Sequence, residues 1–443
     1  MQRIRTNSHY RSAATQALAL TLLLLAACGQ APEQTAVDTA VDAAVDAAVE
    51  PQTVVVYEGA RLIVGDGSAS IENAAFTVDN GRFVAVGAVG EVAVPAGATR
   101  VDLTGMTVMP TIVDAHTHMN TTREALIDDL QRRAYFGVGA AVSMGSDGPD
   151  TPLELRDEVI PGTARFLSAG HGITGPEPGR RVVHWVTTEA EARQAVRDEA
   201  ARNVDLIKIW VDDRDGQYEQ LSPAIYGAVI DEAHQHSLRV AAHIFDLEDG
   251  KGLLRAGVDI FAHGVRDRDI DDEFVELVAA RPNVVLIPNL PGRGVPTELG
   301  WLADAIPDEE LGALQEIVAD PQAQEAFGIQ ARNLARLSDE GMTIAFGTDG
   351  NTPWAPHVEM EDMVAAGMTP EQVIVAATRN AAAVLGLTDM GTIEAGKSAD
   401  FIVLEANPLD DITNTRRIAS VYLRGEMVDR AAISARWSGM ETN

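Results

Sequence analysis

The chain has 443 residues, of which 46% are hydrophobic and 23% charged, and its formal net charge is −32 at pH 7. This length is sufficient for one large domain and a smaller one. The strong negative charge excludes non-specific binding to nucleic acid and to anionic lipid head groups, so we interpret it as a solvated acidic surface.

The N-terminus predicts an export signal. Three arginines precede an apolar stretch, namely Arg3, Arg5 and Arg11. The stretch spans residues 17–27 and is too short to cross a bilayer as a mature helix. It ends in Leu25-Ala-Ala-Cys28, which resembles a bacterial lipoprotein cleavage box, so we expect residues 1–27 to be removed and Cys28 to be lipidated. Because Gly29 follows in place of the aspartate that retains lipoproteins in the inner membrane, we expect an outer-membrane protein that faces the periplasm.

Residues 28–52 predict a flexible acidic tether. A four-residue repeat of the form Ala-Val-Asp-Thr/Ala covers residues 36–50. Its small side chains and repelling charges do not favour a folded element. Cys28 is the only cysteine of the chain, so no internal disulfide is possible. The lipid expected on Cys28 is the only contact with a membrane that the sequence predicts.

Both ends of the remaining chain are rich in strand signals. Residues 53–107 hold short alternating runs separated by Gly and Asn, such as Phe83–Val86. Residues 386–430 hold similar runs, including Phe401–Leu404 and Val421–Gly425.

Between these ends, over residues 108–385, an apolar run followed by a helical pattern recurs eight times. The candidate strands are Val108–Ala115, Gly139–Ser143, Ala164–Leu167, Leu206–Trp210, Arg239–Ala242, Val258–Ala262, Val284–Ile287 and Thr343–Phe346. The amphipathic segments include Arg123–Tyr135, Glu189–Ala201, Ile225–His236 and Glu371–Leu385. This alternation favours a (β/α)8 TIM barrel. No glycine-rich nucleotide turn follows the first strand, which disfavours an open doubly wound sheet.

Metal-binding side chains lie at the ends of these strands. His116 and His118 are two residues apart on one strand, so both face the same way and can bind one divalent cation. Further nitrogen and oxygen donors lie at or near the ends of other strand-like runs, namely Lys208, His243, His263 and Asp349. The carboxyl ends of barrel strands share one face, so the fold brings these donors together. Six ligands are too many for one tetrahedral ion and suit two ions.

Lys208 is one of only three lysines, against 31 arginines, and it interrupts an apolar strand. An unpaired ammonium in such a strand would be costly, and a protonated lysine has no lone pair for a metal. Desolvation and two nearby cations would lower the pKa of Lys208, and the free amine could then take up CO₂ to form a carbamate. The alternative is an ordinary salt bridge to Asp349 or another acid.

Other histidines carry weaker signals. His234 and His236 lie in a helical segment, where their side chains point about 200° apart, so they cannot share a metal. We place His184 and His357 in loops without other ligands nearby.

The order of these motifs resembles the amidohydrolase superfamily, in its binuclear branch with a carboxylated lysine. Within this superfamily, the chain resembles prolidase-like and imidazolonepropionase-like members. The resemblance runs from about Val54 to Val428 and includes three downstream motifs, Gly367–Pro370, Ala377–Ala381 and Gly391–Asp400. It implies that both chain ends, residues 53–107 and 386–430, join into one small β-sandwich that flanks the barrel.

The resemblance also implies a reaction on a small-molecule substrate. Two divalent ions, which we expect to be Zn²⁺, would share the Lys208 carbamate and activate a bridging hydroxide. Asp349 would bind the first ion and act as general base and then general acid. The expected enzyme is a metal-dependent hydrolase that cleaves an amide-type C–N bond, in a dipeptide or an N-acyl amino acid. His171, which follows the third strand, and Trp210 are candidate substrate-binding residues.

Two alternatives stay open. The same ions could serve a hydrolase of lactones, cyclic amides or phosphotriesters, because fold and metal do not select the substrate. A surface lipoprotein could also bind metal without turnover, although such a site would not need a general base. Five arginines of the active-face loops are interpreted as surface charges, namely Arg180, Arg181, Arg214, Arg266 and Arg268.

Overall fold

The computed structural model describes residues 54–148, 151–316 and 318–437, which belong to one compact unit. The expected signal peptide, Cys28 and the expected tether lie outside these residues. Within the described ranges, no helix is long and apolar enough to cross a membrane.

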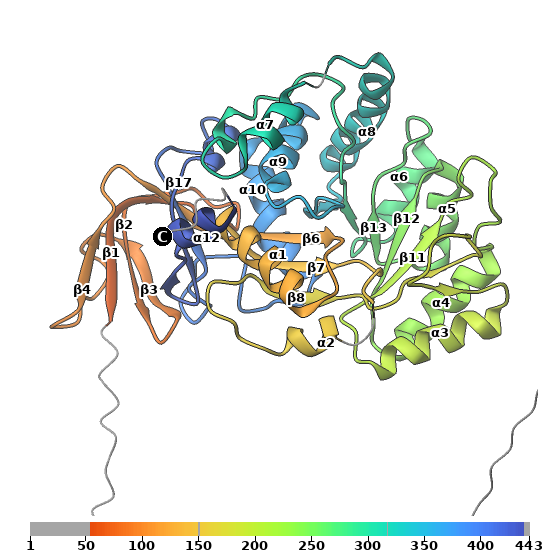
Figure 1. The fold of residues 1–443 in the computed structure, drawn as a ribbon, viewed down its shortest axis with the longest axis horizontal. Helices are drawn as coiled ribbons and strands as arrows, with labels where there is room; N and C mark the ends of the chain where they lie inside the picture. The colour runs from red at the N-terminus through yellow and green to blue at the C-terminus, as the bar shows by residue number, and fades with distance from the viewer. Residues whose placement is uncertain (1–53, 149–150, 317, 438–443) are drawn as a thin grey trace, which may run out of the picture. The chain divides into compact units, whose positions relative to one another are not determined.

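Strands from both chain ends form one eight-stranded mixed sheet, drawn in orange and blue in Figure 1. The strands are β1 (Val55–Leu62), β2 (Ile71–Asp79), β3 (Arg82–Ala88), β4 (Thr99–Asp102), β5 (Thr107–Pro110), β16 (Phe401–Leu404), β17 (Ile418–Leu423) and β18 (Glu426–Met427). Their order is β18-β17-β16-β5-β1-β2-β3, and β4 pairs with β1. We call this part the flanking domain.

Aromatic rings fill the core of the flanking domain. Tyr57 stacks on Phe76 with ring centroids 4.9 Å apart, and Phe401 stacks on Tyr422 at 4.4 Å. Tyr57 and Phe401 meet edge to face at 5.2 Å, so rings from the two ends of the chain form one cluster. Burial of these rings holds the two ends together.

The expected strand Val108–Ala115 is wrong as a single element. The chain leaves the flanking sheet after β5 and enters the barrel with β6 (Ile112–Thr117). At the junction, Thr111 N donates to Asp400 O over 3.2 Å, whereas Ile112 N donates to Gly137 O over 3.0 Å. Both strands are completely buried, so the apolar run gives no sign of the change of sheet.

Eight parallel strands form the barrel. They are β6, β7 (Val138–Ser143), β8 (Arg165–Ser168), β11 (Ile207–Val211), β12 (Val240–Ile244), β13 (Ile260–Ala262), β14 (Val285–Ile287) and β15 (Thr343–Ile344). Asp205 N donates to Ser168 O over 2.9 Å and links β8 to β11, while Ala115 N donates to Phe346 O over 2.9 Å and closes the circle. Two short strands, β9 (Ile173–Thr174) and β10 (His184–Trp185), extend the sheet beside β11. The expected TIM barrel with a flanking domain is confirmed.

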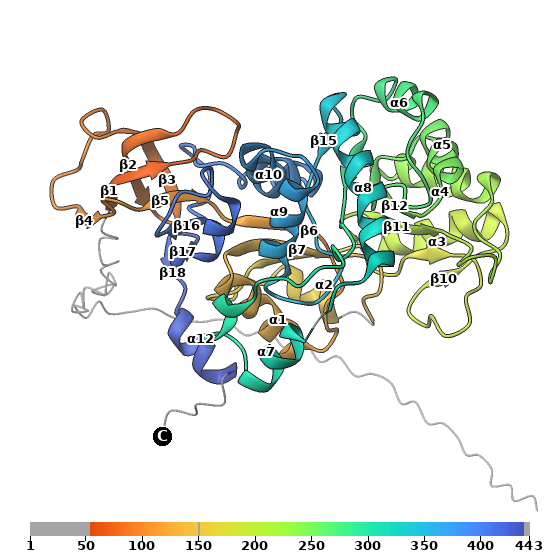
Figure 2. The same ribbon diagram turned by 90° about the horizontal axis from the view of Figure 1, so that it is seen from above.

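Helices cover the barrel, and α3 to α6 follow one another around its outside in Figures 1 and 2. They are α1 (Arg123–Tyr135), α2 (Thr151–Arg156), α3 (Glu189–Ala201), α4 (Pro223–Gln235), α5 (Leu247–Ala256), α6 (Asp272–Ala279), α7 (Asp308–Gln315), α8 (Pro321–Asp339), α9 (Ala355–Ala365), α10 (Pro370–Val375), α11 (Ala381–Val384) and α12 (Arg430–Trp437). Short 3₁₀ turns span Gly300–Leu302 and Ile412–Arg416.

Two helix predictions need correction. The expected helix 371–385 is interrupted by a π-helical turn, Ala376–Asn380, between α10 and α11. His357 lies in α9 rather than in a loop, and its buried ring bonds Thr415 Oγ1 and Phe136 O. It therefore has a structural role between the helix and two other segments.

Candidate metal centre

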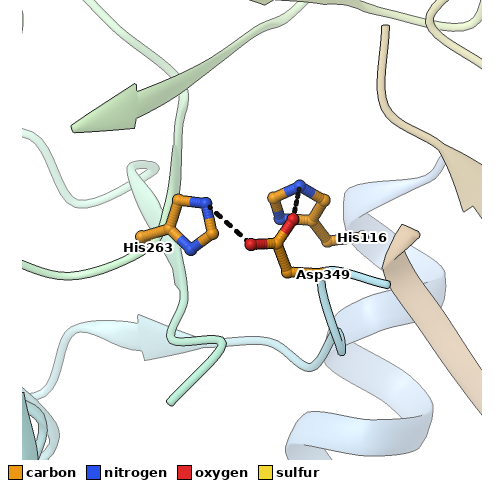
Figure 3. Close-up of side chains that lie close together, drawn as sticks. All are labelled: His116, His263 and Asp349. Atoms are coloured by element: carbon orange, nitrogen blue, oxygen red, sulfur yellow. Dashed lines mark ion pairs between the residues drawn. The ribbon is translucent and has the colours of Figure 1, made fainter. Parts of the chain in front are cut away.

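Asp349 lies at the centre of the candidate ligands. Its Oδ1 is 3.2 Å from Nε2 of both His116 and His118, and its Oδ2 is 3.4 Å from Nε2 of His263. Figure 3 shows His116 and His263 on opposite sides of this carboxylate. Donor atoms of His116, His263 and Asp349 all lie within 4.8 Å of one another, a spacing that allows a metal ion between them. His116 of β6 and His118, which directly follows β6, thus face one point, as their spacing predicts.

Lys208 reaches the same centre from β11. Its Nζ lies 3.2 Å from His116 Nε2, and the side chain is fully buried. Among the described residues, no carboxylate is close enough to form an ion pair with it, so the salt-bridge alternative is wrong. Burial lowers the pKa of Lys208 to about 7; the charge of Asp349 opposes this shift, and the charges of Arg180 and Arg266 add to it.

His243 approaches from β12 and stands next to His263, with ring centroids 4.7 Å apart. Its Nε2 lies 3.0 Å from Asp212 Oδ2, to which it donates, and this leaves Nδ1 as the nitrogen with a free lone pair. Asp212 also accepts from the Arg214 guanidinium. Burial lowers the pKa of His243 to about 4, which keeps the ring neutral. Sequence reasoning did not identify Asp212, because its partner is contributed by the next barrel strand.

Neighbouring side chains fix the orientation of the first ligands. His116 Nδ1 donates to Asn289 Oδ1 over 2.8 Å, so its Nε2 lone pair is directed at the centre. Asp114, which is fully buried, accepts from Arg133 Nη1 over 3.0 Å and from Thr348 Oγ1 over 2.8 Å. Arg133 in turn donates to Gly350 O over 2.9 Å. This buried pair ties the end of β6 to the segment that carries Asp349.

The backbone around the centre is strained. His263, Asn289 and Asp349 have φ angles of 101°, 42° and 54°, in the left-handed region that side chains disfavour. Gly347 is required for a different reason, since a Cβ there would lie 2.7 Å from His116 Cβ. The close approach lets Asp349 N donate to His116 O over 2.8 Å.

A second cluster surrounds His171. Its Nε2 donates to Gly148 O over 3.1 Å, and its backbone N donates to Glu199 Oε2 over 3.1 Å. His184 Nε2 donates to Glu199 Oε1 over 2.8 Å, so the expectation that His184 has no such neighbours is wrong. Glu199 comes from α3, too far along the sequence for spacing to reveal the contact.

Trp210 separates this cluster from Lys208. Its ring lies 5.5 Å from Lys208 Nζ, and the Arg180 guanidinium stacks on it at 4.3 Å. A Cβ at Gly172 would lie 2.2 Å from the ring, so the His171 loop packs directly on it. Trp210 therefore forms a wall beside the centre.

A cavity of about 600 Å³ opens next to the centre. It is lined by residues 212–217, His243, Phe245, Asp246 and Arg266. A larger cavity of about 960 Å³ has Arg82, Arg165 and Arg424 in its lining and none of the candidate ligands. The smaller cavity is therefore the candidate substrate site.

The sequence of this chain is similar to those of known proteins. The model of the Amidohydrolase family matches residues 107–428. An imidazolonepropionase of Deinococcus radiodurans is 27% identical over 385 residues, which cover 80% of this chain and 92% of that protein. An ochratoxinase of Aspergillus niger is 26% identical over 300 residues, 62% of this chain and 55% of that protein.

Solved structures share the fold. A protein from Bifidobacterium longum, provisionally named a prolidase, superposes with a TM-score of 0.72 at 28% identity, covering 87% of this chain and 98% of the other. An Xaa-Pro dipeptidase superposes with a TM-score of 0.69 at 22% identity, covering 85% and 99%. The chain therefore belongs to the amidohydrolase family, whose members are metal-dependent hydrolases acting on carbon–nitrogen bonds.

Proposed function

We propose that the protein is a binuclear amidohydrolase that cleaves a dipeptide or an N-acyl amino acid. Two divalent ions, which we propose to be Zn²⁺, would be held by six residues, namely His116, His118, Lys208, His243, His263 and Asp349. The observation that carries this proposal is Lys208, which is fully buried against His116 and forms no ion pair with a described carboxylate. A carbamate on Lys208 would turn an uncompensated buried amine into an anionic ligand for both ions.

The chemistry of the remaining donors fits these ions. Neutral imidazole nitrogens and a carboxylate are common ligands of Zn²⁺. His118 Nε2 and His263 Nε2 face the Asp349 carboxylate at 3.2 Å and 3.4 Å, so both rings present a nitrogen to the centre.

The ions and Asp349 would have different roles in the proposed hydrolysis. When bound, the ions would polarise the scissile carbonyl and lower the pKa of the attacking water. Asp349 accepts the proton of this water and passes it to the departing nitrogen, because its carboxylate lies among the ligands. The bond from Asp349 N to His116 O fixes the position of this carboxylate during both transfers.

The substrate class rests on the relatives and on the cavity. The similar proteins include an imidazolonepropionase, an ochratoxinase and an Xaa-Pro dipeptidase. A cavity of about 600 Å³ has the size of sites for small molecules.

Asp349→Asn tests the assigned roles. The variant should keep much of its metal, since an amide oxygen still coordinates, yet it cannot accept a proton near neutral pH. The kcat for amides should fall by about 10²–10⁴-fold, and the loss on esters with good leaving groups should be smaller. Steady-state kinetics on a panel of dipeptides, N-acyl amino acids and esters, with elemental analysis of each preparation, measures both effects.

Asp339→Asn, at the exposed end of α8, is the control and should match the wild type. An Asp349→Asn protein that holds two ions and cleaves amides within a few-fold of wild type would contradict the proton transfer.

A further inference from the structure

The arginines of the active-face loops differ in their surroundings. Arg180 pairs with Glu177 at 3.2 Å, Arg214 pairs with Asp212, and Arg268 pairs with Asp267. Arg181 is exposed to solvent. For these four, a structural or surface role accounts for the charge. Arg266 has no such explanation.

Arg266 is a largely buried cation without a partner. Its Nε is buried and has no hydrogen-bond partner, and its guanidinium forms no ion pair with any described residue. The backbone holds it in place, because Arg266 N donates to Phe245 O over 2.8 Å. Burial lowers its pKa, as expected for a cation withdrawn from water. The expectation that Arg266 is a surface charge is therefore wrong.

Arg266 lies at the candidate substrate cavity and close to the metal centre. It lines the cavity together with His243 and Asp212. Its charge lies near enough to Lys208 and His263 to lower the pKa of both. The nearby acids have other partners, since Asp212 contacts Arg214 and His243, and Asp349 contacts three histidines.

We propose that Arg266 binds the carboxylate of the substrate. This inference rests on the proposed function: dipeptides and N-acyl amino acids both carry a carboxylate on the carbon next to the scissile nitrogen. A guanidinium can hold a carboxylate through two parallel hydrogen bonds and would gain the anionic partner that it lacks. No other charged side chain of the cavity lining can bind a carboxylate in this way. Arg214 is already paired with Asp212. The remaining charged residues of the lining are aspartates, namely Asp212, Asp213, Asp215 and Asp246.

Binding measurements on the metal-loaded protein test the inference without turnover. The probes are leucine, phenylalanine and proline, each compared with the amine that lacks its carboxylate, namely 3-methylbutylamine, 2-phenylethylamine and pyrrolidine. Isothermal titration calorimetry should show that at least one amino acid binds about 10- to 100-fold more tightly than its amine. In Arg266→Gln the two affinities should agree within a few-fold, with the amine affinity unchanged.

Two variants complete the design. Arg268→Gln, two residues further along the same loop, should keep the full preference because Arg268 pairs only with Asp267 at the surface. Arg266→Lys keeps the charge but not the paired hydrogen bonds, so it should keep part of the preference even if Arg266→Gln does not fold. Equal affinities in the wild type for all three pairs, or a preference that survives in Arg266→Gln, would overturn the inference.

Failure of the inference and failure of the proposed function give different results. A wild-type enzyme that hydrolyses amides but does not prefer the amino acids would leave the proposed function standing and remove the role of Arg266. A protein that prefers the amino acids but hydrolyses no amide would keep the carboxylate site and remove the proposed reaction.

Discussion

At the scale of single residues, Lys208 gives the most direct test of two bound ions. Lys208→Ala should lose more than about 100-fold in activity and bind fewer than two ions, because the ligand proposed to bridge them is gone. Short carboxylic acids such as formate or propionate should restore part of the activity by taking the place of the carbamate. Elemental analysis and kinetics with and without added acid measure these effects.

Lys397→Ala is the matched control. Lys397 lies outside the metal centre, where it contacts Glu394 at 3.1 Å and donates to Thr392 Oγ1 over 2.6 Å. It should leave metal content and activity unchanged. Two ions in Lys208→Ala would exclude the bridge.

The buried pair of Asp114 and Arg133 should contribute strongly to stability. Asp114→Asn leaves the Arg133 charge in the core without its anion, so the free energy of unfolding should fall by about 3–5 kcal/mol. Urea unfolding of the metal-free protein measures this loss. Asp128→Asn, which breaks a partly exposed pair with Arg132 on the same helix, should cost at most about 0.5 kcal/mol. Equal losses in the two variants would argue against the organising role of the buried pair.

Residues that follow barrel strands could be placed from the sequence, whereas the residues that support them could not. His116, His263 and Asp349 meet because strand ends share one face, a property of the fold itself. Asp212 and Asn289 contact the ligands through bonds that depend on loop conformation. Arg266 looks like any surface arginine in the sequence, because its lack of a partner is a property of the folded loops.

At the scale of elements, helix α5 carries an acid with a pH-dependent effect. Burial, together with the charges of Asp246 and Asp213, raises the pKa of Asp249 from 3.8 to about 6. Between about pH 4 and pH 6 the folded state holds a proton that the unfolded state has lost, so stability falls as the pH rises. The effect should be on the order of 1 kcal/mol, because the carboxyl is only half-buried and water screens it.

Asp249→Asn should remove this decrease of the free energy of unfolding between about pH 4 and pH 6. Unfolding by urea at several pH values, expressed as the difference from wild type, isolates the contribution of Asp249. Asp198→Asn is the control, since this surface carboxylate of α3 accepts a hydrogen bond from Gln194, just as Asp249 accepts one from Gln220. A difference between Asp249→Asn and wild type that stays constant from pH 4 to pH 7 would contradict the prediction.

The elements themselves were largely predictable where periodicity is regular. Helix α1 begins and ends at the expected residues, Arg123 and Tyr135, because Leu126, Leu130 and Ala134 recur at helical spacing on its buried face. The change from β5 to β6 was not visible, since a residue buried in the flanking domain and one buried in the barrel are equally apolar. The π-helical turn within 371–385 could not be predicted either, because such single turns occur inside α-helices and the residues on both sides of it remain helical.

At the scale of the whole molecule, we propose that the protein is exported and anchored by lipid on Cys28. Expressed with its own signal, it should fractionate with membranes, and Cys28→Ser should release it or block its processing. Removal of residues 1–52 should leave kcat unchanged, because the candidate ligands and the first described strand lie beyond this segment. Cell fractionation and activity assays of the wild type, of Cys28→Ser and of the protein without residues 1–52 test these expectations. A wild type that is fully soluble in the periplasm would refute the lipid anchor.

The position of β5 between β1 and β16 has a consequence for how the chain is made. Strand β5 is synthesised early, but its partner β16 begins only at Phe401 and pairs with Pro110 across the sheet. Until then, one edge of β5 has no partner and is exposed to pairing with other chains. A chain that ends before Phe401 therefore leaves this edge of β5 unpaired. Cells that overproduce the protein should accumulate aggregates seeded by its N-terminal third.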